Sequence, residues 1–313
     1  MKRIFYSLLL GCSLLGAGCV TGNVADFTIR VTDDDGKPVA KATVGVGYVI
    51  RSTTIEVGGP TDTNGVFHYR GTFGVDNGWF VRKESFYDLS HMEMHFTNVV
   101  FGRLQPWGER HEVTLRRIIN PIGMYATTMS DPRSVRIPEL GKPFGFDLMK
   151  SDWVAPFGKG EVADFIFQLE SVGDAMRRNA SLTLTFSNPD DGLQVFFSDP
   201  RGGGSVFRSP RYAPKEGYAT NFVSVYRSMG GERRDDERED QNYTFRVRTK
   251  RDEHGAITNA FYGKIYGPIK YGAPFVGCTY YLNPTSLDRN LEFDRTKNLL
   301  KGVVEKGQMP FAP

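Results

Sequence analysis

The sequence predicts an all-β protein built from two folded units. Its 313 residues include 35 Gly, 17 Pro, 23 Phe and 14 Tyr but only 9 Met, a composition typical of short strands joined by turns. Apolar and polar side chains alternate with period two in many segments, as expected for strands with one buried face. At about 150 residues per domain, the length favours two units, each large enough to bury its own core.

The first residues have the pattern of an export signal. Lys2 and Arg3 form a basic start, and the mostly apolar run at residues 4–15 is too short to cross a hydrocarbon core of about 30 Å as a helix. We therefore expect residues 1–18 to be a signal peptide. Residues 15–19, Leu-Gly-Ala-Gly-Cys, resemble the lipobox of bacterial lipoproteins, which implies lipid attachment at Cys19 and a protein anchored to a membrane of the cell envelope.

Two alternatives to this processing stay open. Residues 9–12, Leu-Leu-Gly-Cys, also fit a lipobox, and ordinary cleavage after Ala17 or Gly18 would release a periplasmic or secreted chain. Few cysteines remain after the leader, so the fold is not expected to depend on a disulfide framework. Cys278 lies in a strand-like run and is expected to be buried and unreactive.

Residues 19–120 are expected to form the first unit. Phe27, Ile29 and Val31 alternate with polar residues, which predicts a half-buried strand. Residues 33–38 have the Gly and Pro of a turn, and the Asn-Gly pair at residues 64–65 predicts a hairpin. Further strands are expected at residues 42–50, 66–69, 79–81 and 111–118.

The turn motifs of this unit carry a family resemblance. Asp-Asp-Gly-Lys-Pro-Val-Ala-Lys-Ala-Thr-Val from residue 34, Thr-Asp-Thr-Asn-Gly-Val-Phe from residue 61 and Glu-Val-Thr-Leu at residues 112–115 resemble the carboxypeptidase regulatory-like domain. The resemblance covers about residues 24–120. It implies a seven-stranded transthyretin/Ig-like sandwich that accompanies a functional neighbour and has no catalytic residues of its own. Residues 71–110 depart from the family pattern, being longer and more polar.

Two polar clusters of the first unit could bind a metal ion. The three aspartates at residues 33–35 would suit calcium, but no calcium-loop spacing follows, and a structural turn is favoured. His91, Glu93 and His95 would share one strand face and offer two imidazoles and a carboxylate to zinc or iron. Neighbours on one strand face lie about 6–7 Å apart, which is poor geometry for a single ion. A solvent-exposed face is therefore favoured, and no cofactor is predicted.

Residues 121–313 are expected to form the second unit, after a proline-rich linker. Seven strand-like runs separated by turn residues predict a second β-sandwich or a jelly-roll-like domain. This half resembles no characterised family. The runs are residues 162–169, 181–186, 193–197, 221–226, 242–249, 261–266 and 278–282.

One candidate ligand-binding segment of this unit is rich in glycine. Asp152, Trp153 and Lys159 combine an indole, a carboxylate and accessible backbone, which could stack a sugar ring and bind its hydroxyls. The favoured alternative is that Trp153 fills the core and the aspartates cap turns.

A second candidate is a basic aromatic surface. Arg246 and Arg248 share one strand face, and Tyr262 and Lys264 share a face of the next strand. If these faces coincide, they would suit an acidic glycan, whereas a solvated strand face is the favoured alternative.

These observations lead to a hypothesis about function. Without the leader, acidic and basic residues nearly balance, so no nucleic-acid partner is expected. We expect a noncatalytic cell-envelope lipoprotein that binds a glycan or an envelope protein, or that acts as an accessory scaffold. The alternatives are a glycan-directed hydrolase and a structural component of a surface assembly. The hydrolase would take its acid and base from Asp147, Asp152, Asp164 or Glu170.

Overall fold

The computed structural model describes residues 23–50, 52–74, 77–129, 135–173, 177–198, 205–229, 231, 233–310 and 312–313, with the backbone alone at Ser90 and His91. In this part of the chain nearly every element is a strand. The helices there are two three-residue 3-10 turns, η1 (Arg295–Lys297) and η2 (Lys306–Gln308), and neither has the length to cross a membrane. The all-β fold class is thus confirmed.

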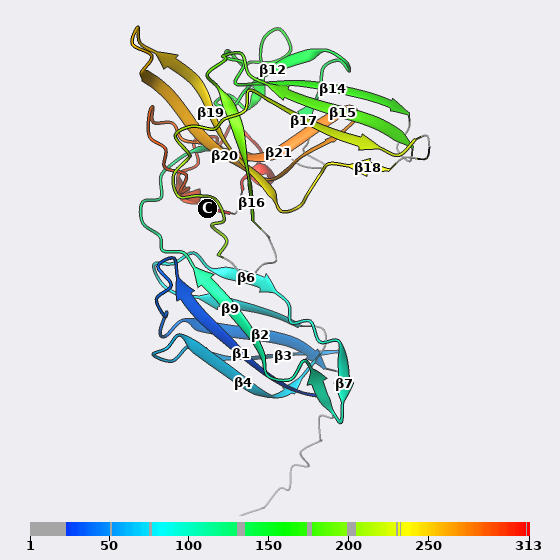
Figure 1. The fold of residues 1–313 in the computed structure, drawn as a ribbon, viewed down its shortest axis with the longest axis vertical. Coiled ribbons are helices and arrows are strands. Elements are labelled where there is room, and N and C mark those ends of the chain that lie inside the picture. Colours follow the sequence, from blue (N-terminus) through cyan, green and yellow to red (C-terminus); the bar gives the residue numbers. More distant parts are fainter. Residues whose placement is uncertain are drawn as a thin grey trace, which may run out of the picture.

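The strands between residues 23 and 115 form two sheets that pack face to face (Figure 1). One sheet has the order β4-β1-β8-β7, with β9 also paired to β1. It contains β1 (Asn23–Asp33), β4 (Val66–Phe73), β7 (Asn98–Val100), β8 (Arg103–Gln105) and β9 (Glu109–Leu115). The other has the order β3-β2-β5-β6 and contains β2 (Thr43–Ile50), β3 (Thr53–Pro60), β5 (Asn77–Arg82) and β6 (Leu89–Met92).

The predicted alternation of β1 builds the core of this first sandwich. Phe27, Ile29 and Val31 are fully buried between the sheets. The predicted hairpin turn also forms, because Gly65 adopts φ +73°, and a Cβ there would lie 2.3 Å from the carbonyl oxygen of Val31. The described residues between 23 and 115 form nine strands instead of the expected seven, because the long segment 71–110 adds the short β7–β8 hairpin.

The second sandwich uses all seven predicted runs and several short strands. One sheet has the order β10-β21-β20-β19-β16, with β11 also paired to β21. It contains β10 (Tyr125–Thr128), β11 (Val135–Arg136), β16 (Gly192–Phe197), β19 (Gln241–Arg251), β20 (Ile257–Gly272) and β21 (Phe275–Leu282). The other has the order β13-β12-β14-β15-β17-β18. It contains β12 (Pro143–Asp147), β13 (Asp152–Trp153), β14 (Phe165–Gly173), β15 (Arg178–Thr185), β17 (Asn221–Arg227) and β18 (Arg234–Asp235).

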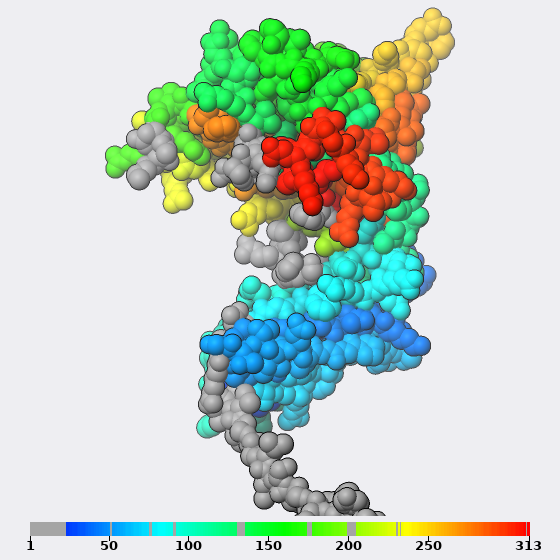
Figure 2. Space-filling view, turned by 180° about the vertical axis from the view of Figure 1, so that it is seen from behind, coloured from blue at the N-terminus to red at the C-terminus, as the bar shows by residue number. Residues whose placement is uncertain are grey.

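The outer face of the sheet that contains β19, β20 and β21 is covered by chain. Residues 205–219, 286–310 and 312–313 lie across it, and their apolar side chains pack onto it in two small clusters. Figure 2 shows the C-terminal residues, in red, gathered on one side of the second unit. Below, this surface is called the covered face.

Hydrogen bonds to Glu292 join the second sandwich to the first where the linker leaves β9. The buried carboxylate of Glu292 accepts hydrogen bonds from the Tyr87 hydroxyl at 2.9 Å and from the Ile119 and Asn120 amides at 2.8 Å each. Arg211 forms an ion pair with the same carboxylate at 2.9 Å. The covering segments therefore also fasten the second unit to the first.

The aspartate turn of the first unit faces this junction. Asp33 accepts the amides of Asp35 and Lys37, as a turn requires, and also pairs with Arg117 at 2.7 Å. Asp34 accepts a hydrogen bond from Arg211 at 3.0 Å. The turn favoured by the sequence is present, and the carboxylates of Asp33 and Asp34 are paired with arginines.

Candidate functional site

Trp153 lies in the core of the second sandwich. Its side chain is 5% exposed, and its ring packs edge-on against Phe146 at 5.3 Å and Phe167 at 6.2 Å between centroids. The indole N–H donates to the carbonyl oxygen of Arg136 at 2.9 Å. Because its faces are occupied by protein, the ligand-stacking role considered for Trp153 has to be corrected.

The polar neighbours of Trp153 shape a turn. The Asp152 carboxylate accepts the Trp153 amide at 2.8 Å and the Lys159 amide at 2.9 Å. The Lys159 side chain is exposed. This arrangement matches the alternative in which the aspartate caps a turn.

The two predicted basic and aromatic strand faces do coincide, since Arg246 lies opposite Tyr262 in the β19–β20 pair. They lie on the covered face, however, and not in solvent. Arg246 is 7% exposed, donates to the carbonyl oxygens of Asp190 at 3.1 Å and Lys215 at 3.2 Å, and lies 5.0 Å from the Tyr218 ring centre. The expectation of a ligand-accessible surface here has to be corrected.

Lys264 is the most enclosed residue of this set. Its side-chain nitrogen donates to the carbonyl oxygen of Leu291 at 2.6 Å and to a backbone oxygen of Pro313 at 2.8 Å. The side chain has no exposure, and burial holds its pKa well below the usual value. Three aromatic rings surround the amine, those of Phe207, Tyr266 and Tyr281, with centres 4.8, 4.6 and 4.8 Å away.

Arg248 leaves the predicted strand face because the register shifts between Val247 and Lys250, where Arg248 itself has φ +56°. Its guanidinium group binds Asp164 at 2.7 and 2.8 Å and Asp147 at 3.0 Å. It therefore forms part of a largely buried ion cluster and no surface with Tyr262.

The same cluster engages two of the carboxylates considered for a hydrolase. Burial raises the pKa of Asp147, but the Glu161 and Val162 amides and the charge of Arg248 outweigh it and hold this pKa below its usual value. Burial raises the pKa of Asp164, against the hydrogen bonds and charge of Arg248. Both carboxylates are buried and are occupied by protein donors.

The histidine cluster keeps the alternation that the sequence predicts. Glu93 and His95 are exposed, while Met94 between them is buried in the first core. The side chain of His91, like Cys19, lies outside the described residues. Among the side chains that are described, no group of three or more His, Cys, Asp or Glu residues is placed to hold a metal ion.

Cys278 is a core residue of β21. It is 4% exposed, and burial raises the pKa of its thiol to about 12. The thiol is therefore protonated at neutral pH, as expected for an unreactive cysteine.

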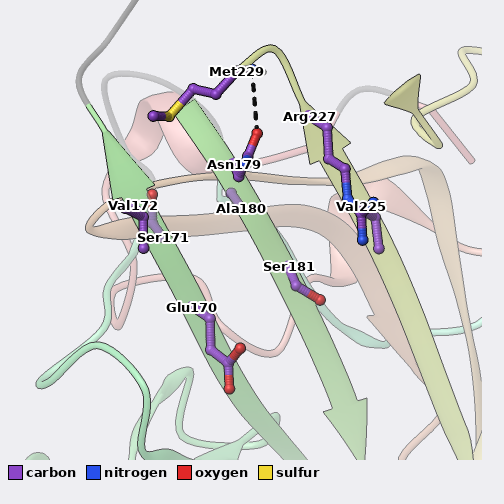
Figure 3. Close-up of a pocket in the computed structure, with 9 residues that line it drawn as sticks. All are labelled: Glu170, Ser171, Val172, Asn179, Ala180, Ser181, Val225, Arg227 and Met229. Carbon is purple, nitrogen blue, oxygen red and sulfur yellow. Dashed lines mark hydrogen bonds between the residues drawn. The ribbon is translucent and has the colours of Figure 1, made fainter. Parts of the chain in front are cut away.

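The outer face of the other sheet, formed by β14, β15 and β17, carries an open hollow of about 600 Å³. We call it the open face. Register places Glu170 beside Ser181, and Asn179 beside Arg227. Figure 3 shows these polar side chains on three adjacent strands, with Met229 at one end. The hollow is lined by Glu170, Ser171, Val172, Asn179, Ala180, Ser181, Val225, Arg227 and Met229.

Local hydrogen bonds shape this hollow. The Asn179 side-chain oxygen accepts hydrogen bonds from the amides of Ser228 and Met229 at 3.3 Å each, which fixes the chain at the rim. Figure 3 shows the bond to Met229. Gln168 donates to the Glu170 carboxylate at 3.2 Å. Along the same face, Thr183 continues the polar row of Ser181 on β15.

A second hollow of about 530 Å³ lies on the outer face of β2, β3 and β5 in the first unit. Its floor is glycine-rich, and the Phe80 ring lies where a Cβ of Gly45 would stand, 2.2 Å from that position. Arg82 lies 4.4 Å from the centre of the same ring. Glu56 and Arg82 are its charged residues, which makes it a natural reference for the open face.

The sequence points to Glu170 only as a possible hydrolase carboxylate, and it does not identify the open face. The sequence signal for the open face is that Glu170 on β14, and Ser181 and Thr183 on β15, are polar residues that alternate with apolar ones. The sequence does not show that β15 pairs with β17, because these strands are separated by more than thirty residues.

No family model matches the chain, and no curated protein does. Among solved structures, 3-chlorocatechol 1,2-dioxygenase of Rhodococcus opacus matches at 13% identity and a TM-score of 0.26, over 31% of this chain and 61% of that one. A DUF3823 family protein of Parabacteroides merdae matches at 8% identity and a TM-score of 0.21, over 87% and 100% of the two chains. BcpA, the major pilin subunit of Bacillus cereus, matches at 12% identity and a TM-score of 0.22, over 83% and 96%.

The alignments with the catechol dioxygenases cover less than two thirds of the length of those enzymes. At these scores the similarities carry no argument about function. The proposal below rests on the chain's own residues.

Proposed function

We propose that this protein is a noncatalytic cell-envelope protein that binds a glycan on the open face of its second unit. The observation that carries the proposal is the uncovered hollow on β14, β15 and β17, with Glu170, Ser181, Asn179 and Arg227 on adjacent strands. Sugar hydroxyls both donate and accept hydrogen bonds. A surface that combines a carboxylate, a hydroxyl, an amide and a guanidinium group suits them.

The carboxylates support binding over hydrolysis. Most glycoside hydrolases need two carboxyl groups flanking the scissile bond, about 5–10 Å apart. Among the residues that line the hollow, Glu170 alone is acidic. Asp147 and Asp164 share Arg248, and Asp152 caps a turn.

We also propose that the protein is anchored through a lipid at Cys19, and that residues 24–120 belong to the carboxypeptidase regulatory-like family. The lipobox-like residues and the turn motifs of the first unit support these two proposals. In this arrangement the first sandwich is a spacer, and the second presents the open face to its ligand.

A glycan array with charge-neutralised variants tests the binding site. The double variant Glu170→Gln with Arg227→Gln should lose at least about tenfold in affinity, because hydrogen bonds to charged groups contribute about 1.5–3 kcal/mol each. The matched control is Glu56→Gln with Arg82→Gln in the hollow of the first unit, which should bind like the wild type.

The outcomes separate the possibilities. Loss of binding in the control pair alone would move the site to the first unit, and absence of any glycan binding by the wild type would contradict the proposal. Hydrolysis of a bound glycan, followed by product analysis, would contradict the noncatalytic part.

A further inference from the structure

The tip of the β7–β8 hairpin exposes apolar side chains that the fold does not explain. Phe101 is 100% exposed, and Val99 and Val100 are 47% and 43% exposed. The two-residue loop has φ +48° at Phe101 and +74° at Gly102. Asn and Gly are favoured where φ is positive, and a bulky residue is disfavoured there. Phe101 therefore lowers the stability of the fold in two ways, through its positive φ and through its fully exposed apolar ring.

The hairpin lies where the chain enters the fold. The Val24 amide donates to the carbonyl oxygen of Gly102 at 2.8 Å, and Val24 is paired with Arg103. Only three residues lie between Cys19 and Asn23, the start of β1, and these four residue-to-residue steps span at most about 14 Å. Figure 1 shows β7 at the end of the first sandwich that is remote from the second. A lipid on Cys19 would hold this tip close to the bilayer.

The base of the hairpin carries groups that suit a lipid headgroup layer. The half-buried Trp107 has the guanidinium groups of Arg103 and Arg70 at 4.9 and 5.4 Å from its ring centre. Arg70 also lies 3.8 Å from Asp26, which His68 contacts at 3.0 Å. Tryptophan and arginine favour the interface between lipid and water, where the ring is partly buried and the cation meets phosphate.

We propose that the β7–β8 hairpin is a second membrane contact, in which Phe101 and its two valine neighbours insert into the surface of an anionic bilayer. This inference rests on the anchor of the proposed function. A tethered surface meets the bilayer at high effective concentration, so even a small apolar tip engages it. Together the two contacts fix the orientation of the molecule, with the second unit held away from the membrane.

The test attaches the anchor chemically, so that it does not depend on acylation in the cell. A chain of residues 19–313 is coupled through Cys19 to a maleimide-headgroup lipid in vesicles of phosphatidylethanolamine and phosphatidylglycerol. The thiol of Cys278 does not compete because it is buried. Phe101→Trp, made together with Trp107→Phe, places the one responsive indole at the tip, because the remaining native Trp79 and Trp153 are buried and report little on lipid.

The expected result is a blue shift of the added indole on vesicles and loss of most of its emission with bromine-labelled acyl chains. The control is Phe157→Trp in the second unit, again made together with Trp107→Phe. Phe157 is 56% exposed, and this indole should remain unquenched. Emission from the tip that is the same with and without vesicles, or equal quenching at both positions, would overturn the inference.

A second variant separates membrane contact from folding. Phe101→Asn replaces a disfavoured residue with one that favours positive φ, so the unfolding midpoint should not fall. The emission of Trp107 should shift on vesicles in the wild type but not in this variant. A shift that persists in Phe101→Asn would overturn the role of Phe101. Metabolic labelling with radioactive fatty acid tests acylation of Cys19 separately, and the glycan array uses uncoupled protein.

Discussion

The two outer faces of the second sandwich have similar strand patterns and opposite environments. On the covered face, Arg246 and Lys264 point away from the core of the sandwich and meet residues 205–219, 286–310 and 312–313. On the open face, Glu170 and Arg227 leave the same core and are exposed. The alternation of apolar and polar residues along a strand thus shows only that a polar side chain points away from the core of the sandwich. Segments distant in the sequence decide whether water or protein lies beyond it.

From this difference between the covered and the open face, we expect the largest change in the free energy of unfolding on substitution of Lys264. Lys264→Ala would leave the carbonyl oxygen of Leu291 and a backbone oxygen of Pro313 without their donor and create a void beneath three rings. We expect a loss of about 3 kcal/mol of the free energy of unfolding. Urea unfolding followed by near-ultraviolet circular dichroism measures it.

Lys270 on the same strand is the matched control, since its side chain is 65% exposed and lies 3.7 Å from Glu237. Lys270→Ala should change stability by less than about 0.5 kcal/mol. Equal effects of the two substitutions would mean that the covered face contributes no more than an exposed one.

The second largest effect that we expect is a loss of stability at low pH, through Glu292 at the junction of the two units. Burial raises the pKa of Glu292, but the Asn120 and Ile119 amides, the Tyr87 hydroxyl and Arg211 outweigh it, so this pKa lies below the usual 4.5. The stability that Glu292 contributes is therefore present above pH 4.5 and is lost as pH falls through the lowered pKa.

The measurement is the slope of unfolding free energy against pH in the wild type and in Glu292→Gln, which does not titrate. We expect a smaller acid-side slope in the variant, and faster proteolysis of the wild-type linker as pH falls below 4.5. Identical slopes would show that Glu292 does not couple the two units to pH.

The smallest effect is expected on the open face. Glu170→Gln and Arg227→Gln should each change the free energy of unfolding by less than about 0.5 kcal/mol, because substitutions at exposed positions rarely do more. Thermal unfolding measures this, and the same variants serve in the glycan array. A loss above about 1 kcal/mol would indicate that this face has a structural role.

Local signals account for what the sequence predicted correctly. The seven strand-like runs of the second unit, the buried alternation of Phe27, Ile29 and Val31, and the glycine turn at Gly65 all depend on neighbours within a few residues. They can be predicted because the strand period and the residue preferences of turns are visible within short stretches of sequence.

The candidate site depends on contacts and strand pairings between residues that are far apart in the sequence, which short stretches of sequence do not reveal. The pairing of Arg246 with Tyr262 was anticipated as a possibility, but its cover comes from irregular segments without periodicity. A local register shift turned Arg248 away from the predicted face to Asp147 and Asp164. The open face needed β17 beside β15, and no adjacent turn specifies that pairing.

Strand β1 also determines how the molecule would carry tension. It starts at Asn23, close to the proposed anchor, and runs parallel to β9 from Phe27 beside Glu109 to Asp33 beside Leu115. The linker to the second unit leaves from the far end of β9. A pull between the anchor and a ligand held by the second unit would act on opposite ends of two adjacent strands. Their ladder of hydrogen bonds would then be loaded in shear, all bonds together, instead of being unzipped one at a time.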